Sequence, residues 1–264
     1  MAEIQTEPAS VAQTRESLRY RVRFDEANPD GLVRTSTLLR WAQDVAWVHS
    51  ERLGFTRAWY AERGLAWLVR GVELRVLQAV PPGRELAVST EVVGYRKVWA
   101  RRRTDFRTPA GELAAWAHTD WVITDRRGAP VRVPSEFGAF VTHPAPSFSP
   151  TRLAAEVSPD EVSKRILPVR LRELDPMGHV NNAIYLDHLE EGVSGIDGGL
   201  PALASIPRAY RLEYLMPAEP GDELVAVAWR SAPDTFHFRL ARRDGTDLFR
   251  GVLVCVDEHD ARAM

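Results

Sequence analysis

The sequence predicts an α+β protein made of two similar units, each a long helix wrapped by an antiparallel β-sheet. The order strand, loop, helix and four strands occurs twice along the 264 residues. A long helix that precedes an antiparallel sheet buries its apolar face most simply when the sheet wraps around it. Two such units would present complementary surfaces to each other, like the halves of a symmetric dimer fused in one chain.

The first unit begins with a strand pattern and continues into a long helix. Apolar and charged residues alternate over residues 18–25, which predicts a half-buried strand. Thr35 or Ser36 is expected to cap a helix that runs to about Leu53, with Gly54 as its stop. Strand patterns follow at about 66–77, 85–94, 97–107 and 113–124.

The second unit repeats this order after a proline-rich segment. It reads as a strand over 167–172, a loop over 175–182 and a helix over 182–192. Strand patterns recur near 206–215, 223–230, 235–241 and 248–257. We therefore expect a disordered tail at 1–17, a first domain at 18–133, a linker at 134–165, a second domain at 166–258 and a short tail at 259–264.

Composition narrows the classes of function. The formal net charge is −2, which selects neither nucleic acid nor a membrane as partner. A single cysteine allows no intrachain disulfide, and no apolar run approaches the roughly 18 residues of a membrane span. The N-terminus lacks the apolar core of a signal peptide, so the cytoplasm is expected. The histidines show no metal-ligand spacing, and we expect neither a metal nor a cofactor.

One stretch, Asp175-Pro176-Met177-Gly178-His179-Val180-Asn181-Asn182, concentrates polar groups directly before the second helix. Its carboxylate, imidazole and amides would meet the unpaired N–H groups and the positive dipole end of that helix. Such a place suits the binding and polarisation of a carbonyl oxygen. The first unit has Asn28 and Leu32 at the equivalent positions. Neither titrates, so acid–base chemistry is expected in the second unit.

The residues of this stretch allow catalytic and purely structural roles. Asp175 could act as a general base on water or attack a carbonyl carbon directly. His179 could orient Asp175 or the water, or donate to an oxyanion. Asn181 and Asn182 could donate N–H bonds to a substrate or cap the helix. A plain turn residue and a structural histidine remain the alternatives for Asp175 and His179.

Two other features bear on binding. The first unit holds seven of the eight tryptophans, which suits an apolar binding wall. Arg101-Arg102-Arg103 is the strongest basic cluster. In an alternating strand Arg101 and Arg103 share one face, so the triplet cannot form a single patch. It is either a solvated sheet face or a docking site for an acidic protein or a phosphate group.

The pattern that joins a strand to this stretch and then to Tyr185 on a helix resembles the hot-dog thioesterases. The duplication, the length, and the stretches 94–97 (Gly-Tyr-Arg-Lys) and 121–125 (Trp-Val-Ile-Thr-Asp) resemble the acyl-ACP thioesterases. The fold of that family is a tandem double hot dog. The resemblance covers about residues 18–258.

This resemblance implies hydrolysis of a fatty acyl thioester, carried by ACP or CoA, without a metal or cofactor. Asp175 and His179 match the aspartate and histidine of the family's catalytic loop, and Asn181 is expected beside them. Gly178, Asn182 and Tyr185 are expected to contact substrate. The protein would act as a monomer or a homodimer.

Two departures leave alternatives open. An asparagine and a glutamate of plant members correspond here to Met177 and Pro217. The loop is closer to that of simpler hot-dog acyl-CoA thioesterases, where one aspartate does most of the chemistry. The alternatives are an acyl-CoA thioesterase, a non-catalytic acyl- or carrier-binding module, and a hydratase acting on enoyl thioesters.

Overall fold

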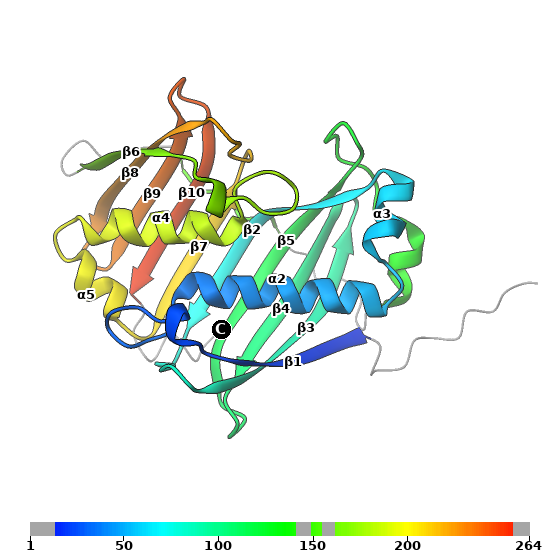
Figure 1. Cartoon of the computed structure of the whole chain (residues 1–264), viewed down its shortest axis with the longest axis horizontal. Helices are drawn as coiled ribbons and strands as arrows, with labels where there is room; N and C mark the ends of the chain where they lie inside the picture. Colours follow the sequence, from blue (N-terminus) through cyan, green and yellow to red (C-terminus); the bar gives the residue numbers. More distant parts are fainter. Residues whose placement is uncertain (1–13, 141–148, 155–161, 256–264) are drawn as a thin grey trace, which may run out of the picture.

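The computed structural model describes residues 14–140, 149–154 and 162–255, which form two layers. One layer is an antiparallel sheet of ten strands, and the helices α2 and α4 cover one of its faces (Figure 1). The strands are β1 (Arg15–Arg21), β2 (Ala66–Val76), β3 (Glu85–Arg96), β4 (Trp99–Arg107), β5 (Leu113–Thr124), β6 (Val162–Pro168), β7 (Arg208–Tyr214), β8 (Glu223–Ala232), β9 (Thr235–Arg242) and β10 (Asp247–Cys255). The helices are α2 (Thr35–Arg52), α3 (Arg57–Arg63), α4 (Asn182–Ser194) and α5 (Gly199–Ala204).

The two halves of the sheet have the same order of strands. From one edge to the centre the order is β1-β3-β4-β5-β2, and from the other edge it is β6-β8-β9-β10-β7. Strands β2 and β7 pair at the centre, from Gly71↔Glu213 to Val76↔Arg208. The helices of the two halves also meet, with an Arg40–Asp187 ion pair at 2.9 Å. The loop that precedes α4 thereby lies beside α2.

The core lies between the helices and the sheet. On α2, Leu38, Ala42 and Val45 recur at helical spacing and are buried, as the apolar stripe of an amphipathic helix requires. On α4, Leu186 and Leu189 are fully buried in the same core. Burying one such side chain contributes about 1.5–3 kcal/mol, so this packing fixes where the helix ends lie.

The element boundaries differ from expectation at the two edge strands. Strand β1 spans Arg15–Arg21, so part of the expected 1–17 tail is structured, and Phe24 is 92% exposed in a 3₁₀ helix. The sequence did not indicate the start of this strand, because the charged residue Glu16 occupies a buried position there. Its carboxylate pairs with Arg52 at 2.6 Å. Strand β6 begins at Val162, inside the expected linker and ahead of the expected 167–172 strand. An edge strand is held by backbone pairing, so its side-chain pattern is a weak signal.

Part of the expected linker packs as core. Residues Ser135–Phe140 form a 3₁₀ helix that inserts Phe137 into a second apolar cluster. The Phe137 ring stacks on Phe55 at 4.1 Å and meets Trp59 edge-on at 5.6 Å. The first half therefore carries an aromatic cluster beyond the end of α2. The division into two domains at 134–165 stays a prediction.

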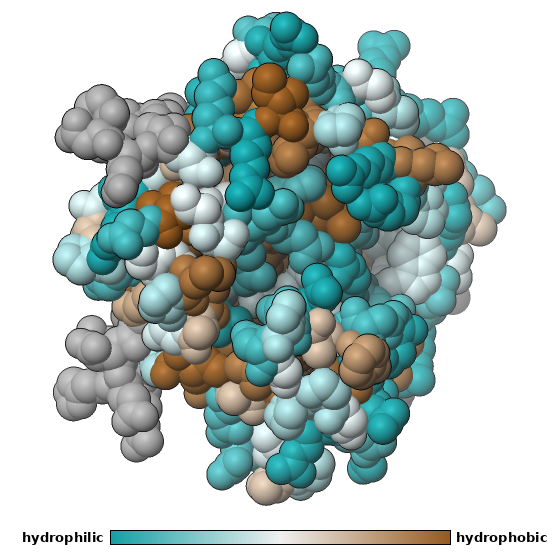
Figure 2. Space-filling model, turned by 60° about the vertical axis from the view of Figure 1, so that its left-hand side comes forward, coloured by the Kyte–Doolittle hydropathy of each residue, from teal (hydrophilic) through white to brown (hydrophobic). Residues whose placement is uncertain are grey.

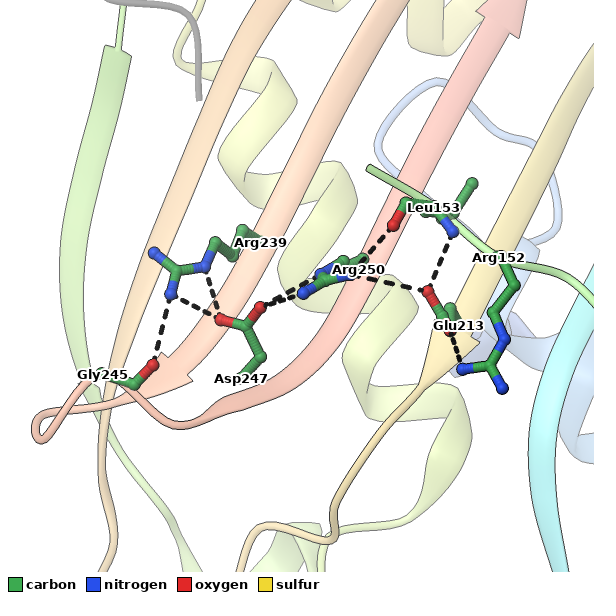
Figure 3. Close-up of polar contacts among 7 residues, drawn as sticks. All are labelled: Arg152, Leu153, Glu213, Arg239, Gly245, Asp247 and Arg250. Atoms are coloured by element: carbon green, nitrogen blue, oxygen red, sulfur yellow. Dashed lines mark hydrogen bonds and ion pairs between the residues drawn. The ribbon is translucent and has the colours of Figure 1, made fainter. Parts of the chain in front are cut away.

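Another part of the expected linker crosses the sheet on the face opposite the helices (Figure 3). Glu213 is 3% exposed and accepts a hydrogen bond from the Leu153 backbone N–H at 2.9 Å. Arg250 donates to the Leu153 carbonyl at 2.9 Å. Since these bonds involve the backbone, they tie this segment to β7 and β10 irrespective of its side chains.

The surface is mixed. On the face shown in Figure 2, hydrophobic residues gather in separate patches divided by hydrophilic ones. Large exposed apolar side chains include Phe24, Trp47, Ile166, Leu171, Met177, Leu200 and Met216. Within the described part of the chain, no helix combines the length and apolar character needed to span a bilayer.

Candidate active site

The loop before α4 is a tight turn fixed by its own backbone. The Asp175 N–H donates to the His179 carbonyl at 2.9 Å, and the Gly178 N–H donates to the Asp175 carbonyl at 2.9 Å. Gly178 has φ +84°, a conformation that residues with a Cβ rarely adopt. Gly178 therefore shapes the turn that brings Asp175 and His179 together.

The Asp175 carboxylate and the His179 imidazole face each other across this turn. Oδ1 of Asp175 lies 3.6 Å from Nδ1 of His179 and accepts a hydrogen bond from the Met177 N–H at 2.8 Å. Their side chains are 16% and 24% exposed. Both groups are therefore mostly withdrawn from water while retaining some access.

Asn181 caps α4 and also reaches the other half of the molecule. Its Oδ1 accepts a hydrogen bond from the Ala183 N–H at 3.0 Å, the usual geometry of an N-cap. Its Nδ2 donates to Oε1 of Gln43 on α2 at 3.4 Å. Gln43 is thus a first-half residue at the candidate site, and nothing in its sequence context signalled this.

Asn182, the first residue of α4, borders a small pocket between α2 and the sheet. The pocket has room for little more than a water molecule. Its polar lining residues are Gln43, Arg102, Thr119, Trp121, Asn182 and Tyr214. The Tyr214 hydroxyl donates to the Asn182 carbonyl at 3.0 Å. Both halves of the chain therefore build the space next to the start of α4.

Tyr185 supports the loop from within the core. It is 2% exposed, and its hydroxyl accepts a hydrogen bond from the Ala218 N–H at 2.8 Å. The Ala218 carbonyl in turn accepts from the Val180 N–H at 2.9 Å. Burial raises the pKa of Tyr185 to about 12. Tyr185 is not among the residues that line the pocket beside Asn182, and its contact with substrate stays a prediction.

Pro217 lies next to the loop because the segment after β7 pairs with it through Ala218. The Pro217 carbonyl accepts a hydrogen bond from Arg242 at 2.9 Å. In plant relatives the position that corresponds to Pro217 is expected to be polar. In this chain that position lies next to the loop over 175–182. In this chain a proline without an ionisable group stands there.

The expected tryptophan wall is only partly present. Trp121 lines the pocket, whereas Trp41 stacks on Tyr20 and Trp47 is 51% exposed. Trp116 lies against the Arg103 guanidinium at 4.2 Å. The abundance of tryptophan in the first half therefore reflects several separate roles.

The three arginines of β4 point to opposite faces, as their alternation predicts. Arg101 pairs with Asp120 at 2.6 Å and Arg103 with Asp105 at 2.6 Å. Arg102 instead faces α2, where it contacts Nδ1 of His49 at 2.8 Å. Among residues 14–140, 149–154 and 162–255, no group of three or more His, Cys, Asp or Glu side chains could hold a metal ion.

Comparison with known proteins agrees with this architecture. Residues 14–140 match the model of the acyl-ACP thioesterase N-terminal domain. The crystal structure of an acyl-ACP thioesterase from Bacteroides thetaiotaomicron is 16% identical, with a TM-score of 0.79 over 93% of this chain and 99% of that one. The 12:0-ACP thioesterase from Umbellularia californica is 19% identical, with a TM-score of 0.76 over 91% and 96%.

No curated protein matches the chain. At these identities the solved structures establish the fold, which is that of the hot-dog acyl-ACP thioesterases. The family model matches the first half of the chain by sequence, while the loop described above lies in the second. The resemblance to the acyl-ACP thioesterase family is therefore confirmed, over residues 14–140 by the family model and over nine-tenths of the chain by the fold.

Proposed function

We propose that the protein hydrolyses fatty acyl thioesters, with acyl-ACP as the leading substrate and Asp175 as the catalytic carboxylate. The observation that carries this proposal is the Asp175–His179 pair, held 3.6 Å apart in a turn at the start of α4. The match of the first half to the acyl-ACP thioesterase family supports the choice of reaction and of carrier.

Two routes are open to Asp175. As a general base it takes a proton from water while the water oxygen attacks the thioester carbon; the thiol leaves with a proton and the acid is released. As a nucleophile it forms a mixed anhydride and expels the thiol, and water then hydrolyses the anhydride. In both routes His179 orients the carboxylate or the water. Asn181 and Asn182 supply N–H groups close to the reacting carbonyl.

Met177 and Pro217 favour a catalytic site with fewer polar side chains, in which one aspartate does most of the chemistry. Both positions are polar in plant relatives, and here neither side chain can bind water or share a proton. Acyl-CoA stays the alternative substrate, because the simpler hot-dog acyl-CoA thioesterases also rely on one aspartate. Met177 is 61% exposed, so its side chain lies at the outer rim of the loop.

We further infer that residues 18–133 and 166–258 are two hot-dog units in tandem. The identical order of strands in the two halves of the sheet supports this division. The unpaired edges of β1 and β6 leave both a monomer and a homodimer open.

Mass spectrometry of products tests the proposed function. Acyl-ACP and acyl-CoA of matched chain length are incubated with the protein, and the acid, the carrier and the intact thioester are quantified. We expect free acid and free carrier, with the faster substrate identifying the carrier. Intact thioester would instead indicate a binding module, and addition of water to an enoyl thioester would indicate a hydratase.

A further inference from the structure

Arg102 is a partly buried cation that faces α2. Its NH1 group contacts Nδ1 of His49 at 2.8 Å and Oγ1 of Thr90 at 3.4 Å. Arginine is only a donor, so Nδ1 of His49 must accept, and this imidazole is neutral with its proton on Nε2. Within the described residues no carboxylate pairs with Arg102. Burial lowers the pKa of Arg102 accordingly.

The neighbouring arginines show that this situation is specific to Arg102. Arg101 binds both oxygens of Asp120, at 2.6 and 2.8 Å. Arg103 pairs with Asp105. Removing a guanidinium from water without a counter-ion is costly, so an uncompensated one is the arrangement to explain.

A donor next to Arg102 lacks a hydrogen-bond partner among the described residues. Nε1 of Trp121 is buried and has no hydrogen-bond acceptor within the described structure. Thr119 lies directly opposite Arg102 in the β4–β5 register, and Trp121 follows two residues later. All three side chains therefore share the inner face of the sheet, and all three line the pocket beside Asn182.

We propose that this pocket, which has room for little more than a water molecule, receives an acceptor oxygen carried by the acyl group and held by the Arg102 guanidinium and the Trp121 indole N–H. A carboxylate fits best because it also neutralises the guanidinium charge. This inference rests on the proposed function, since it places the thioester of the same acyl group at the Asp175 loop. It narrows the substrate from acyl thioesters in general to oxygenated ones.

The reason is the cost of a donor without an acceptor and a charge without an anion. A plain alkyl end at this pocket would leave the Trp121 N–H and the Arg102 guanidinium in that state. An oxygen placed between them satisfies both. A hydrogen bond to a charged group discriminates by about tenfold to a hundredfold, which sets the size of the expected preference.

Substrate preference is measured with three CoA thioesters of the same length: hexanoyl, β-hydroxyhexanoyl and adipoyl. Wild-type kcat/KM is expected to favour the oxygenated substrates, adipoyl most of all. Arg102→Met should reduce the adipoyl-to-hexanoyl ratio by about tenfold or more. Trp121→Phe should reduce it less, because a neutral donor contributes less than a charged one.

Two further variants control this comparison. Arg103→Met removes an arginine from the same strand on the opposite face, where Asp105 keeps Arg107 at 3.1 Å. This variant should leave the substrate ratio unchanged. Arg102→Lys keeps the charge without the planar fork, so its ratio should lie between those of the wild type and Arg102→Met. It also reports on the pocket if Arg102→Met fails to fold.

Binding without turnover separates this inference from the proposed function. Calorimetry is performed with hexanoyl and adipoyl analogues in which an amide replaces the thioester. Tighter binding of the adipoyl analogue, lost in Arg102→Met, supports the inference even if no thioester is hydrolysed. Hydrolysis of all three thioesters with no preference for oxygen, and a ratio unaltered by Arg102→Met and Arg102→Lys, would overturn it while the proposed function stands.

Discussion

The loop before α2 and the loop before α4 have the same backbone and different chemistry. In the first, the Asn28 N–H donates to the Leu32 carbonyl at 2.7 Å; in the second, Asp175 and His179 make the same bond at 2.9 Å. The glycines that close the two turns have φ +76° and +84°. The conformation is thus maintained without the ionisable side chains.

The two loops also connect to their surroundings in the same way. The Val33 N–H donates to the Val80 carbonyl at 2.8 Å, and the Val180 N–H donates to the Ala218 carbonyl at 2.9 Å. Because these bonds need no particular side chain, one loop could lose or gain reactive groups without altering the fold. Mutations at Asn28 and Asp175 can therefore separate the proposed function from the fold.

Exchanging the side chains of the two loops should have the largest effect. Asp175→Asn with His179→Leu gives the second loop the side chains of the first, and acid release should fall by about 10²–10⁴-fold, the range of general base catalysis. The converse pair, Asn28→Asp with Leu32→His, should leave wild-type turnover unchanged. Restoration of activity by the converse pair in the inactive background would show that either loop can act.

Removing an aromatic ring from the cluster found only in the first half should destabilise the protein next most. Phe137→Ala empties a position that is 4% exposed and stacked on Phe55, and should lower the free energy of unfolding by about 3 kcal/mol. Phe24→Ala, at a residue 92% exposed, is the control and should alter it little. Urea unfolding compares the two. Equal effects would mean that the 3₁₀ helix over 135–140 does not contribute to the hydrophobic core.

The residues that cap the two helices are expected to differ by a smaller amount in their contribution to the free energy of unfolding. Asn181 caps α4 with its side chain, whereas Arg34 at the same place before α2 makes no side-chain cap. Asn181→Ala should therefore lower the free energy of unfolding by about 1 kcal/mol, and Arg34→Ala by much less.

Asn181→Asp keeps the cap and removes the amide donor to Gln43. A fall in turnover with stability retained would assign Asn181 to the reaction. Turnover that follows stability alone through both Asn181 variants would leave it as a cap.

The last comparison concerns the pH dependence of stability. His118 meets Trp116 edge-on and His237 stacks on Trp229, one pair in each half. Desolvation lowers the pKa of both, and at His118 the nearby Arg103 and Arg101 help to lower it to about 4.

Between about pH 6.5 and pH 4 the unfolded chain binds a proton at residue 118 that the folded protein does not, so stability falls as the pH falls through this window. His118→Gln should flatten this loss, as measured by urea unfolding at several pH values. His237→Gln should flatten it less, and the reverse ranking would contradict the role given to the two arginines.

The long helices and inner strands were predictable from sequence because their apolar periodicity matches their burial. The helix expected to end near Leu53 ends at Arg52, and the strand expected over 113–124 has those bounds. The edge strand β6 was misplaced since only one side of its backbone pairs, and its side chains carry little pattern.

The candidate site was predictable only where its residues are adjacent in sequence. Asp175 and His179 were predicted together because one turn contains both. Gln43 and Arg102 are far away along the chain, and their approach depends on how α2 packs and on the register of β4. Tyr185 was expected to contact substrate because of its place in the motif; helical periodicity places it in the core, and the substrate contact stays a prediction.

Turnover of the single variant Asp175→Asn tests the central claim most directly. Acid release from an acyl thioester is compared with that of the wild type, with circular dichroism confirming that both are folded. The expected result is a loss of about a hundredfold or more with the fold intact. Turnover equal to that of the wild type would contradict the assignment of the reaction to the loop that precedes α4.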